Sequence, residues 1–242
     1  MNEEKLTVLL KRDGFIVCVK PAGVSSEEGT EASPGMPGLI ARTLSLPDSS
    51  GVLPVHRLDQ GTGGVMVYAL SRACAAALSR LIADGRMDKT YLAVTEGCPD
   101  APEGRWTDLM YWDRSRRKAY TVSRARKGVR EAALRYETLG QKDGLCLLRI
   151  ALETGRTHQI RLQCASRGLP VMGDRRYGGK RPCEGPALWC ESLRFPDPED
   201  GRRAVSALVP PPRERTPWRF FMDQGLFENG LSEHGVIEYG PL

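Results

Sequence analysis

The residues best suited to chemistry are the guanidinium and carboxylate of the segment His56-Arg57-Leu58-Asp59. The next five residues, Gln60 to Gly64, include three glycines, which let the backbone approach a ligand closely. An arginine within ~4–6 Å keeps an aspartate ionised, and an ionised, fixed aspartate can act as a nucleophile. On these residues alone, a structural ion pair in a turn is the commoner explanation. The segment therefore offers Asp59 as one candidate catalytic residue.

A second segment, Glu153 to Arg161, reads ETGRTHQIR and combines a glycine turn with the start of a predicted helix. Helix N-termini present free N–H groups that favour anions, so Arg156, Thr157 and Gln159 are candidate substrate-binding residues. Arg161 could meet either a phosphate or Asp59. The alternative is a capped surface helix, with His158 packed as a core histidine rather than acting as a base.

Two further segments carry charge. Residues 168–178, GLPVMGDRRYG, have the residues of a turn, for which a structural role is favoured. Residues 114–130 contain eight Lys or Arg, one tyrosine and no acid, which fits phosphate contact. A solvated basic hairpin without a partner is an equally weighted alternative. The candidate RNA-backbone residues are Arg114, Arg116, Arg117, Lys118, Arg124, Arg126 and Lys127.

The elements that must position these residues are mostly strands. β-branched and apolar runs predict strands, whereas helical spacing of Ala and Leu predicts two helices. We expect strands at 15–19, 64–69, 89–95, 130–138, 145–151 and 188–195, a strand end at 53–55, helices at 72–84 and 157–167, and a loop at 26–37. Gly85 and Gly168 are expected to end the helices, and Thr154 or Thr157 to cap the second. Many strands with few helices predict an α+β fold with a largely antiparallel sheet.

Length, charge and composition narrow the class of protein to which the chain can belong. The chain has 242 residues, a net charge of +5, and apolar runs too short for the ~20 residues that span a bilayer. Its N-terminus has no signal-peptide pattern, so we expect a cytoplasmic protein with its seven scattered cysteines reduced. Three histidines, His56, His158 and His234, and no paired Cys-x-x-Cys predict no metal. We expect one domain over 1–242, with a weakly patterned tail at 222–242 that packs loosely, and a monomer on RNA.

Taken together, five blocks resemble the RluA-type family of pseudouridine synthases. They are KPAG at 20–23, HRLDQGTGG at 56–64, KTYLAV at 89–94, TGRTHQIR at 154–161 and GLPVMGDRRYGG at 168–179, and the similarity runs from about residue 13 to 212. The resemblance implies a single catalytic domain with a mixed, mainly antiparallel central sheet flanked by helices and loops. It also implies isomerisation of uridine to pseudouridine in ribosomal or transfer RNA, without a cofactor.

The resemblance also implies roles for single residues. Asp59 matches the essential aspartate, Tyr91 the active-site tyrosine that lies against the uracil, and Arg161 the basic residue that pairs with the aspartate. Arg57 matches the arginine that helps to fill the space of the flipped uridine, and Leu188 an apolar residue of the uracil pocket. No separate N-terminal RNA-binding domain is expected, because few residues precede the first block.

Three departures from the family pattern affect substrate contacts rather than the reaction class. Gly63 stands where the family usually has serine, Gln163 where it often has histidine, and Trp189-Cys190 where His-Ala is common. Two mechanisms stay open, attack of Asp59 on ribose C1′ to form an ester, and elimination to a glycal. The alternatives are a non-catalytic RNA-binding relative and, ranked lower, a hydrolase, which normally needs two carboxylates.

Overall fold

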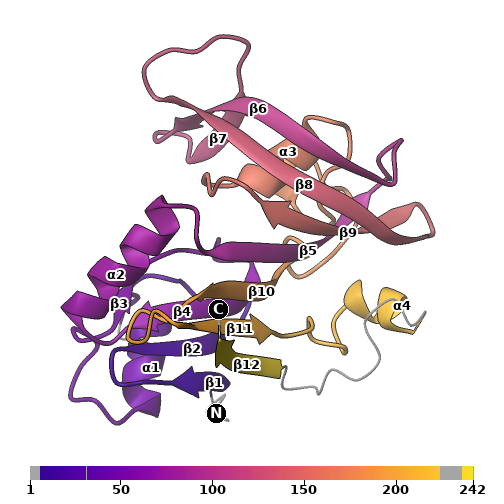
Figure 1. Cartoon of the computed structure of the whole chain (residues 1–242). Helices are drawn as coiled ribbons and strands as arrows, with labels where there is room; N and C mark the ends of the chain where they lie inside the picture. Colours follow the sequence, from indigo (N-terminus) through magenta and orange to yellow (C-terminus); the bar gives the residue numbers. More distant parts are fainter. Residues whose placement is uncertain (1–5, 31, 224–235, 242) are drawn as a thin grey trace. The chain divides into compact units, whose positions relative to one another are not determined.

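The computed structural model describes residues 6–30, 32–223 and 236–241, which gather into two compact units (Figure 1). Of the described residues, unit 1 comprises 6–30, 32–89, 190–211 and 236–241, and unit 2 comprises 90–189 and 212–223. The chain passes from one unit to the other within β5 (Asp88–Glu96) and within β10 (Leu188–Pro196). Asp59 therefore belongs to unit 1, whereas Tyr91 and Arg161 belong to unit 2.

Unit 1 is built on a sheet in the order β1–β2–β4–β10, which β11 and β12 continue and to which β3 adds beside β4. The strands are β1 (Val8–Lys11), β2 (Phe15–Lys20), β3 (Leu53–Pro54), β4 (Gly63–Ala69), β11 (Arg203–Leu208) and β12 (Val236–Pro241). β2 and β4 pair antiparallel, from Phe15 beside Ala69 to Lys20 beside Gly64. Consecutive residues of β2 and of β4 are buried, as expected for strands covered on both faces.

Two helices complete unit 1: α1 (Met36–Thr43), which buries Met36 and Ile40, and α2 (Arg72–Ala83), which packs against β3 and β4. The Ser71 hydroxyl caps α2 by accepting the Cys74 N–H at 3.2 Å. Gly85, with φ of +67°, follows the helix end, as predicted.

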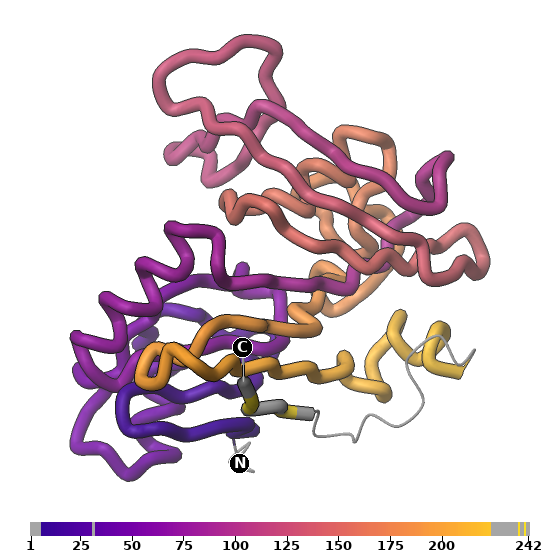
Figure 2. The backbone as a smooth tube through the Cα atoms, viewed as in Figure 1, coloured from indigo at the N-terminus to yellow at the C-terminus, as the bar shows by residue number. Residues whose placement is uncertain are grey.

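Unit 2 is an antiparallel sheet in the order β5–β9–β8–β6–β7, in which β6 lies between β7 and β8. Figure 2 shows the path of the chain through this sheet, whose other strands are β6 (Glu103–Asp113), β7 (Lys118–Thr121), β8 (Val129–Lys142) and β9 (Leu145–Leu152). Its short helices are α3 (Gln159–Ala165), a 3-10 turn η1 (Arg175–Tyr177) and α4 (Trp218–Met222). A cluster of buried side chains joins α3, η1 and the strands: Met110, Ala119, Ala132, Leu162 and Tyr177.

The α+β class with a mainly antiparallel sheet and flanking helices is confirmed, and so are all six predicted strands, the strand end at 53–55 and the first helix. All seven cysteines are free in the structure, and their reduced state in the cell stays a prediction. The single domain over 1–242 stays a prediction. Several elements lacked a sequence signal that we recognised: α1, whose start overlaps the expected loop, and β1, β6, β7, β11 and α4.

Two predictions were wrong. The second helix starts at Gln159 rather than 157, and neither Thr154 nor Thr157 caps it, because His158 takes the N-cap position with φ of +58° and no side-chain cap bond. The tail was expected to pack loosely, but residues 236–241 form β12 and pair with β11, since six consecutive backbone pairings are available there. The rest of the tail from 224 on, His234 included, lies outside the described residues.

Candidate active site and RNA-binding surface

The loop that carries Asp59 is tied to unit 1 on both sides. On the N-terminal side of Asp59, the buried Ser26 side chain holds the backbone of Leu58. Its hydroxyl donates to the Leu58 carbonyl at 2.8 Å and accepts the Leu58 N–H at 3.1 Å. On the C-terminal side, the Thr62 N–H donates to the Asp59 carbonyl at 2.9 Å, which closes a tight turn. The Asp59 side chain is half-buried. The backbone on either side of Asp59 is therefore fixed by hydrogen bonds.

His56 anchors the start of the same segment. Its Nε2 accepts the Val67 N–H of β4 at 3.2 Å. Burial, with a smaller effect from the nearby Lys89 charge, lowers the pKa of His56 to about 3. The imidazole therefore stays neutral at physiological pH and holds the segment against β4, which is a structural role.

Gln60 joins the Asp59 loop to the turn after β2. Its carbonyl accepts the Gly23 N–H at 2.8 Å, and its side-chain Nε2 donates back to the Gly23 carbonyl at 3.0 Å. Gly23 has φ of +96°, a conformation that favours glycine. Lys20 adds a third bond, from Nζ to the Gln60 carbonyl at 3.1 Å. The first and second family-like blocks of the sequence thus form one local structure.

Arg57 is exposed and forms an ion pair with Glu27, whereas the sequence suggested Asp59 as its partner. Its Nη1 lies 3.2 Å from a Glu27 carboxylate oxygen, and the two side chains are 55% and 58% exposed. Such an exposed pair is weak and easily displaced. Arg57 can therefore exchange Glu27 for an anionic ligand at little cost, and its part in filling the space of a flipped base stays a prediction.

In unit 2, Tyr91 and Leu188 are both buried, each about 6% exposed. Tyr91 lies on β5, opposite Ile150 of β9, and Leu188 begins β10. A pleated strand fixes the direction of each side chain, so the sheet sets where the phenol of Tyr91 points. Their contact with a uracil stays a prediction.

Arg161 forms a buried bidentate ion pair. Its Nε and Nη2 donate to the two carboxylate oxygens of Asp174 at 2.6 and 2.8 Å, with side chains 9% and 1% exposed. The guanidinium also lies over the Tyr177 ring, 5.2 Å from its centroid. Asp174 therefore orients Arg161, a role that the sequence did not indicate. The pairing of Arg161 with Asp59 stays a prediction.

Tyr177 links this pair to His158 and β7. Its hydroxyl accepts the Ala119 N–H at 2.8 Å and lies 2.9 Å from His158 Nδ1. The imidazole also meets the rings of Trp112 and Tyr177 edge-on. His158 is therefore hydrogen-bonded and packed against two aromatic rings, but it is half-buried rather than in the core as predicted.

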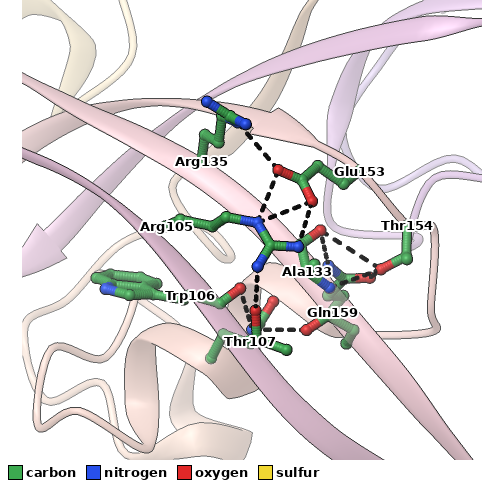
Figure 3. A network of polar contacts seen from close by, with 10 residues as sticks. Arg105, Trp106, Thr107, Ala133, Arg135, Glu153, Thr154 and Gln159 are labelled. Atoms are coloured by element: carbon green, nitrogen blue, oxygen red, sulfur yellow. Dashed lines mark hydrogen bonds and ion pairs between the residues drawn. The ribbon is translucent and has the colours of Figure 1, made fainter.

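The loop before α3 is held to β8 by a network of polar contacts (Figure 3). Thr154 and Gln159 bond each other at 2.8 Å and both bond the backbone of Ala133, and Gln159 is 3% exposed. Next to them, Glu153 pairs with Arg105 and Arg135, which lowers the pKa of Glu153 to about 2.

The three substrate-binding residues predicted in this loop differ in their exposure. Gln159 is buried and structurally engaged, Thr157 is half-buried, and Arg156 is exposed with its Nε donating to the Glu131 carbonyl at 2.9 Å. Arg156 and Thr157 precede α3 rather than starting it, so the helix-terminus reasoning does not apply to them. Their contacts with substrate stay predictions.

The basic hairpin, residues 114–130, comprises the turn between β6 and β7, β7 itself, the connection from β7 to β8 and the first two residues of β8. Six of its predicted RNA-backbone residues are exposed and Lys118 is half-buried. Tyr111 and Tyr120 lie directly opposite each other on β6 and β7. Arg126 lies 5.3 Å over the Tyr111 ring and Lys118 lies 5.8 Å from the Tyr120 ring. A cation therefore lies beside each of these two tyrosine rings.

Comparison with known proteins identifies the family. Residues 14–166 match the RNA pseudouridylate synthase family. The chain belongs to that family. An uncharacterized RNA pseudouridine synthase of Mycobacterium bovis is 33% identical over 224 residues, which cover 87% of this chain and 71% of the relative. A second uncharacterized member, from Haemophilus influenzae, is 31% identical over 174 residues, covering 72% of this chain and 74% of the relative.

Two solved structures share the fold. Human RNA Pseudouridylate Synthase Domain Containing 4 superposes with a TM-score of 0.69 at 19% identity, covering 85% of this chain and 88% of that chain. Human RNA Pseudouridylate Synthase Domain Containing 1 gives 0.68 at 22% identity, covering 99% and 91%. The family membership makes this protein an RNA-modifying isomerase whose substrate is RNA.

Two features of the described residues bear on other functions. Within 6–30, 32–223 and 236–241, no three His, Cys, Asp or Glu side chains gather as a metal site would need. Over the same ranges, none of the helices has the length and apolar character to cross a membrane.

Proposed function

We propose that this pseudouridine synthase uses Asp59 as its nucleophile on a uridine of ribosomal or transfer RNA that has left its base stack. The observation that carries the proposal is the fixed half-buried loop around Asp59, in which Ser26 and Gln60 hold the backbone on either side. A catalytic group has to be held in a productive geometry, and a loop braced in this way supplies that. The reaction breaks the bond from ribose C1′ to uracil N1 and joins C1′ to C5, so it is redox-neutral.

Tyr91 and Arg161 are the proposed partners of Asp59. The phenol of Tyr91 stacks on the uracil, and its hydroxyl moves a proton during the turn of the base. Arg161, oriented by Asp174, keeps the nucleophile ionised before attack. Arg57 fills the space of the flipped nucleotide after leaving Glu27. An enzyme that works on a base must take it out of the duplex, which favours loops or single strands as substrate.

The basic hairpin is proposed to hold the RNA backbone. Its exposed arginines and lysines meet phosphates, and Tyr111 and Tyr120, each with a cation beside its ring, suit unpaired bases, which stack on aromatic rings. The protein is proposed to act in the cytoplasm, as a monomer.

A non-catalytic RNA-binding relative is the second candidate. It would need the basic hairpin but not the bracing of the Asp59 loop. The tight hydrogen bonding of that loop favours the enzyme.

The test compares wild type with Asp59→Ala in a strain that lacks the gene. Ribosomal and transfer RNA are mapped for pseudouridine by carbodiimide labelling and primer extension. Asp48→Ala, at an exposed aspartate of the same unit, is the matched control. We expect at least one site to vanish on deletion, to return with wild type and Asp48→Ala, and to stay absent with Asp59→Ala.

Two results would contradict the proposal in different ways. If no site changes in any strain, catalysis on these RNAs is wrong and the binding-protein alternative stands. If Asp59→Ala restores the site, the reaction is right but the nucleophile is wrong.

A further inference from the structure

Two thiols that the proposed function does not use lie within unit 2. Cys98 follows the end of β5 by two residues and is half-buried. Cys146 is the second residue of β9 and is fully buried. Both are free cysteines. They are far apart in the sequence, so the fold has to bring them together.

The order of the strands brings Cys98 over β9 and β8. Because the sheet runs β5–β9–β8–β6, the connection from β5 to β6 has to cross the two strands between them. It begins at Gly97, whose N–H donates to the Gly144 carbonyl at 2.9 Å. Further along, the Ala101 carbonyl accepts the Tyr136 hydroxyl at 3.4 Å. Cys98 lies between these two contacts, on the face of the sheet that carries the Tyr136 side chain.

Cys146 points to the same face. It lies opposite Thr95 of β5 and opposite Gln141 of β8. Side chains of directly opposite residues share one face of a sheet. The Cys98 thiol donates to the Gln141 side-chain carbonyl at 3.4 Å, so Cys98 and Cys146 are both neighbours of Gln141. Cys146 in turn lies 4.0 Å from the Thr138 hydroxyl. The two thiols are therefore adjacent on this face.

The surroundings of the two thiols make them unequal. Burial and, to a smaller extent, a hydrogen bond with the Cys98 thiol raise the pKa of Cys146 to about 12. Cys146 therefore stays protonated and closed to solvent, whereas a small oxidant can reach the half-buried Cys98. Cys98 also lies in a connection rather than in a strand, so its backbone can adjust to the specific geometry of a disulfide.

We propose that Cys98 and Cys146 form a redox-modification site: a peroxide oxidises Cys98, and Cys146 then closes a reversible disulfide that ties the β5–β6 connection to β9. In a reducing compartment both residues are thiols, and the link forms only when an oxidant is present. The cross-link acts on unit 2 alone, at the end of the strand that carries Tyr91.

The chemistry takes two steps. The Cys98 sulfur attacks one oxygen of hydrogen peroxide, the O–O bond breaks, and a sulfenic acid and one water form. The Cys146 sulfur then attacks the sulfenic sulfur, so that an S–S bond forms and the S–O bond breaks. The hydroxyl group leaves with the Cys146 proton as a second water. The two thiols lose two electrons, which reduce the peroxide, and an excess of a small thiol reverses the link.

Peptide mapping tests the link directly, because trypsin releases each cysteine in a peptide of its own. Cys98 falls in residues 90–105 and Cys146 in residues 143–149. The folded full chain is treated with hydrogen peroxide, its remaining thiols are alkylated, and the digest is analysed by mass spectrometry without reductant. We expect the two peptides to be joined, with a mass two hydrogens below their sum, and to separate when dithiothreitol is added.

Three variants assign the roles. Cys98→Ser and Cys146→Ala should both lack the link. Cys183→Ser is the matched control and should keep it, since Cys183 is also half-buried but bonds the Thr216 carbonyl at 3.4 Å. In Cys146→Ala the sulfenic acid has no thiol to attack it, so dimedone should label Cys98 at least tenfold more than in wild type. If Cys146→Ala does not fold, Cys98→Ser carries the test.

The link should also stabilise the fold, because it restrains the unfolded chain between the two cysteines. We expect oxidised wild type to melt ~5 °C above the reduced protein. Peroxide-treated Cys98→Ser should show no such rise. A link that forms without a rise in melting temperature overturns the stabilising effect.

Several outcomes overturn the inference. They are oxidation of Cys98 to a sulfinic acid without a link, a link from Cys98 to another cysteine, and an unmodified Cys98. A link that forms in urea but not in the folded protein overturns it too, because the fold then does not bring the thiols together. None of these measurements depends on activity, so the inference and the proposed function fail separately.

Discussion

The Asp59 loop of unit 1 and the basic hairpin of unit 2 hold positive charge in opposite ways. Lys20 is fully buried and donates to three backbone carbonyls, whereas Arg124, Arg126 and Lys127 are exposed in the connection from β7 to β8. A buried cation with all donors used can only fix the geometry around it. An exposed cation keeps its donors for a partner such as RNA. The difference between the two regions is therefore one of burial, not of residue type.

The largest effect is expected at Arg161, the buried cation of unit 2. Asp174→Asn removes one charge from the pair with Arg161, which is almost fully buried. Breaking a buried ion pair leaves an uncompensated charge, so we expect a loss of about 3–5 kcal/mol in the free energy of unfolding, measured by urea denaturation.

Asp200→Asn is the control, because Asp200 pairs with Arg203 at the surface, where the side chains are 45% and 53% exposed. This change should leave the free energy of unfolding within ~0.5 kcal/mol of wild type. If Asp174→Asn and Asp200→Asn lower the free energy of unfolding equally, burial does not determine which cations stabilise the fold.

The hairpin should show the converse behaviour, with RNA affinity affected and stability unaffected. Replacing Arg124 and Lys127 together by alanine removes two phosphate contacts, so the slope of log affinity against log salt should decrease by about 2. Tyr120→Ala removes a stacking ring and should cost about 1–3 kcal/mol of RNA binding. Both effects are measured by fluorescence anisotropy over a salt series.

A double substitution of Arg72 and Arg202 by alanine is the matched control. Both residues are exposed in unit 1, and the change in net charge is the same. If this control reduces the salt slope as much as the hairpin variant does, net charge rather than the hairpin determines RNA binding.

The smallest effect on stability is expected at the exposed pair of Arg57 and Glu27. Alanine at either position should change the free energy of unfolding by less than about 1 kcal/mol. Activity should separate the two variants, since Arg57→Ala loses the group proposed to replace the flipped base, whereas Glu27→Ala only removes the partner of that group. Steady-state release of tritium from RNA labelled at uracil C5 checks this, and an equal loss in both variants would make the pair structural.

The sequence predicted the fold class and most strands because apolar and β-branched runs mark buried strands such as β2 and β4. It missed β6 and β7, whose alternating burial lies among charged residues and resembles a solvated segment. For the candidate site, the family-like blocks supplied Asp59, Tyr91 and Arg161. The blocks also contain Lys20 and Asp174, but they did not indicate which groups these two residues bond.

The reason is physical in both cases. Lys20 bonds backbone carbonyl groups, which every residue has, so no residue type in the sequence marks its partners. Asp174 pairs with Arg161, thirteen positions away, although Arg175 and Arg176 are its immediate neighbours. Long-range pairs of this kind depend on the turn at Gly173, where φ is +77°, and not on proximity along the chain.

The most direct test of the central claim uses purified wild type and Asp59→Ala with RNA labelled with tritium at uracil C5. The account predicts that wild type releases tritium in a single turnover and that Asp59→Ala binds the same RNA with the same Kd but releases none. Release by Asp59→Ala at a rate comparable to wild type would contradict the assignment of Asp59 as the nucleophile.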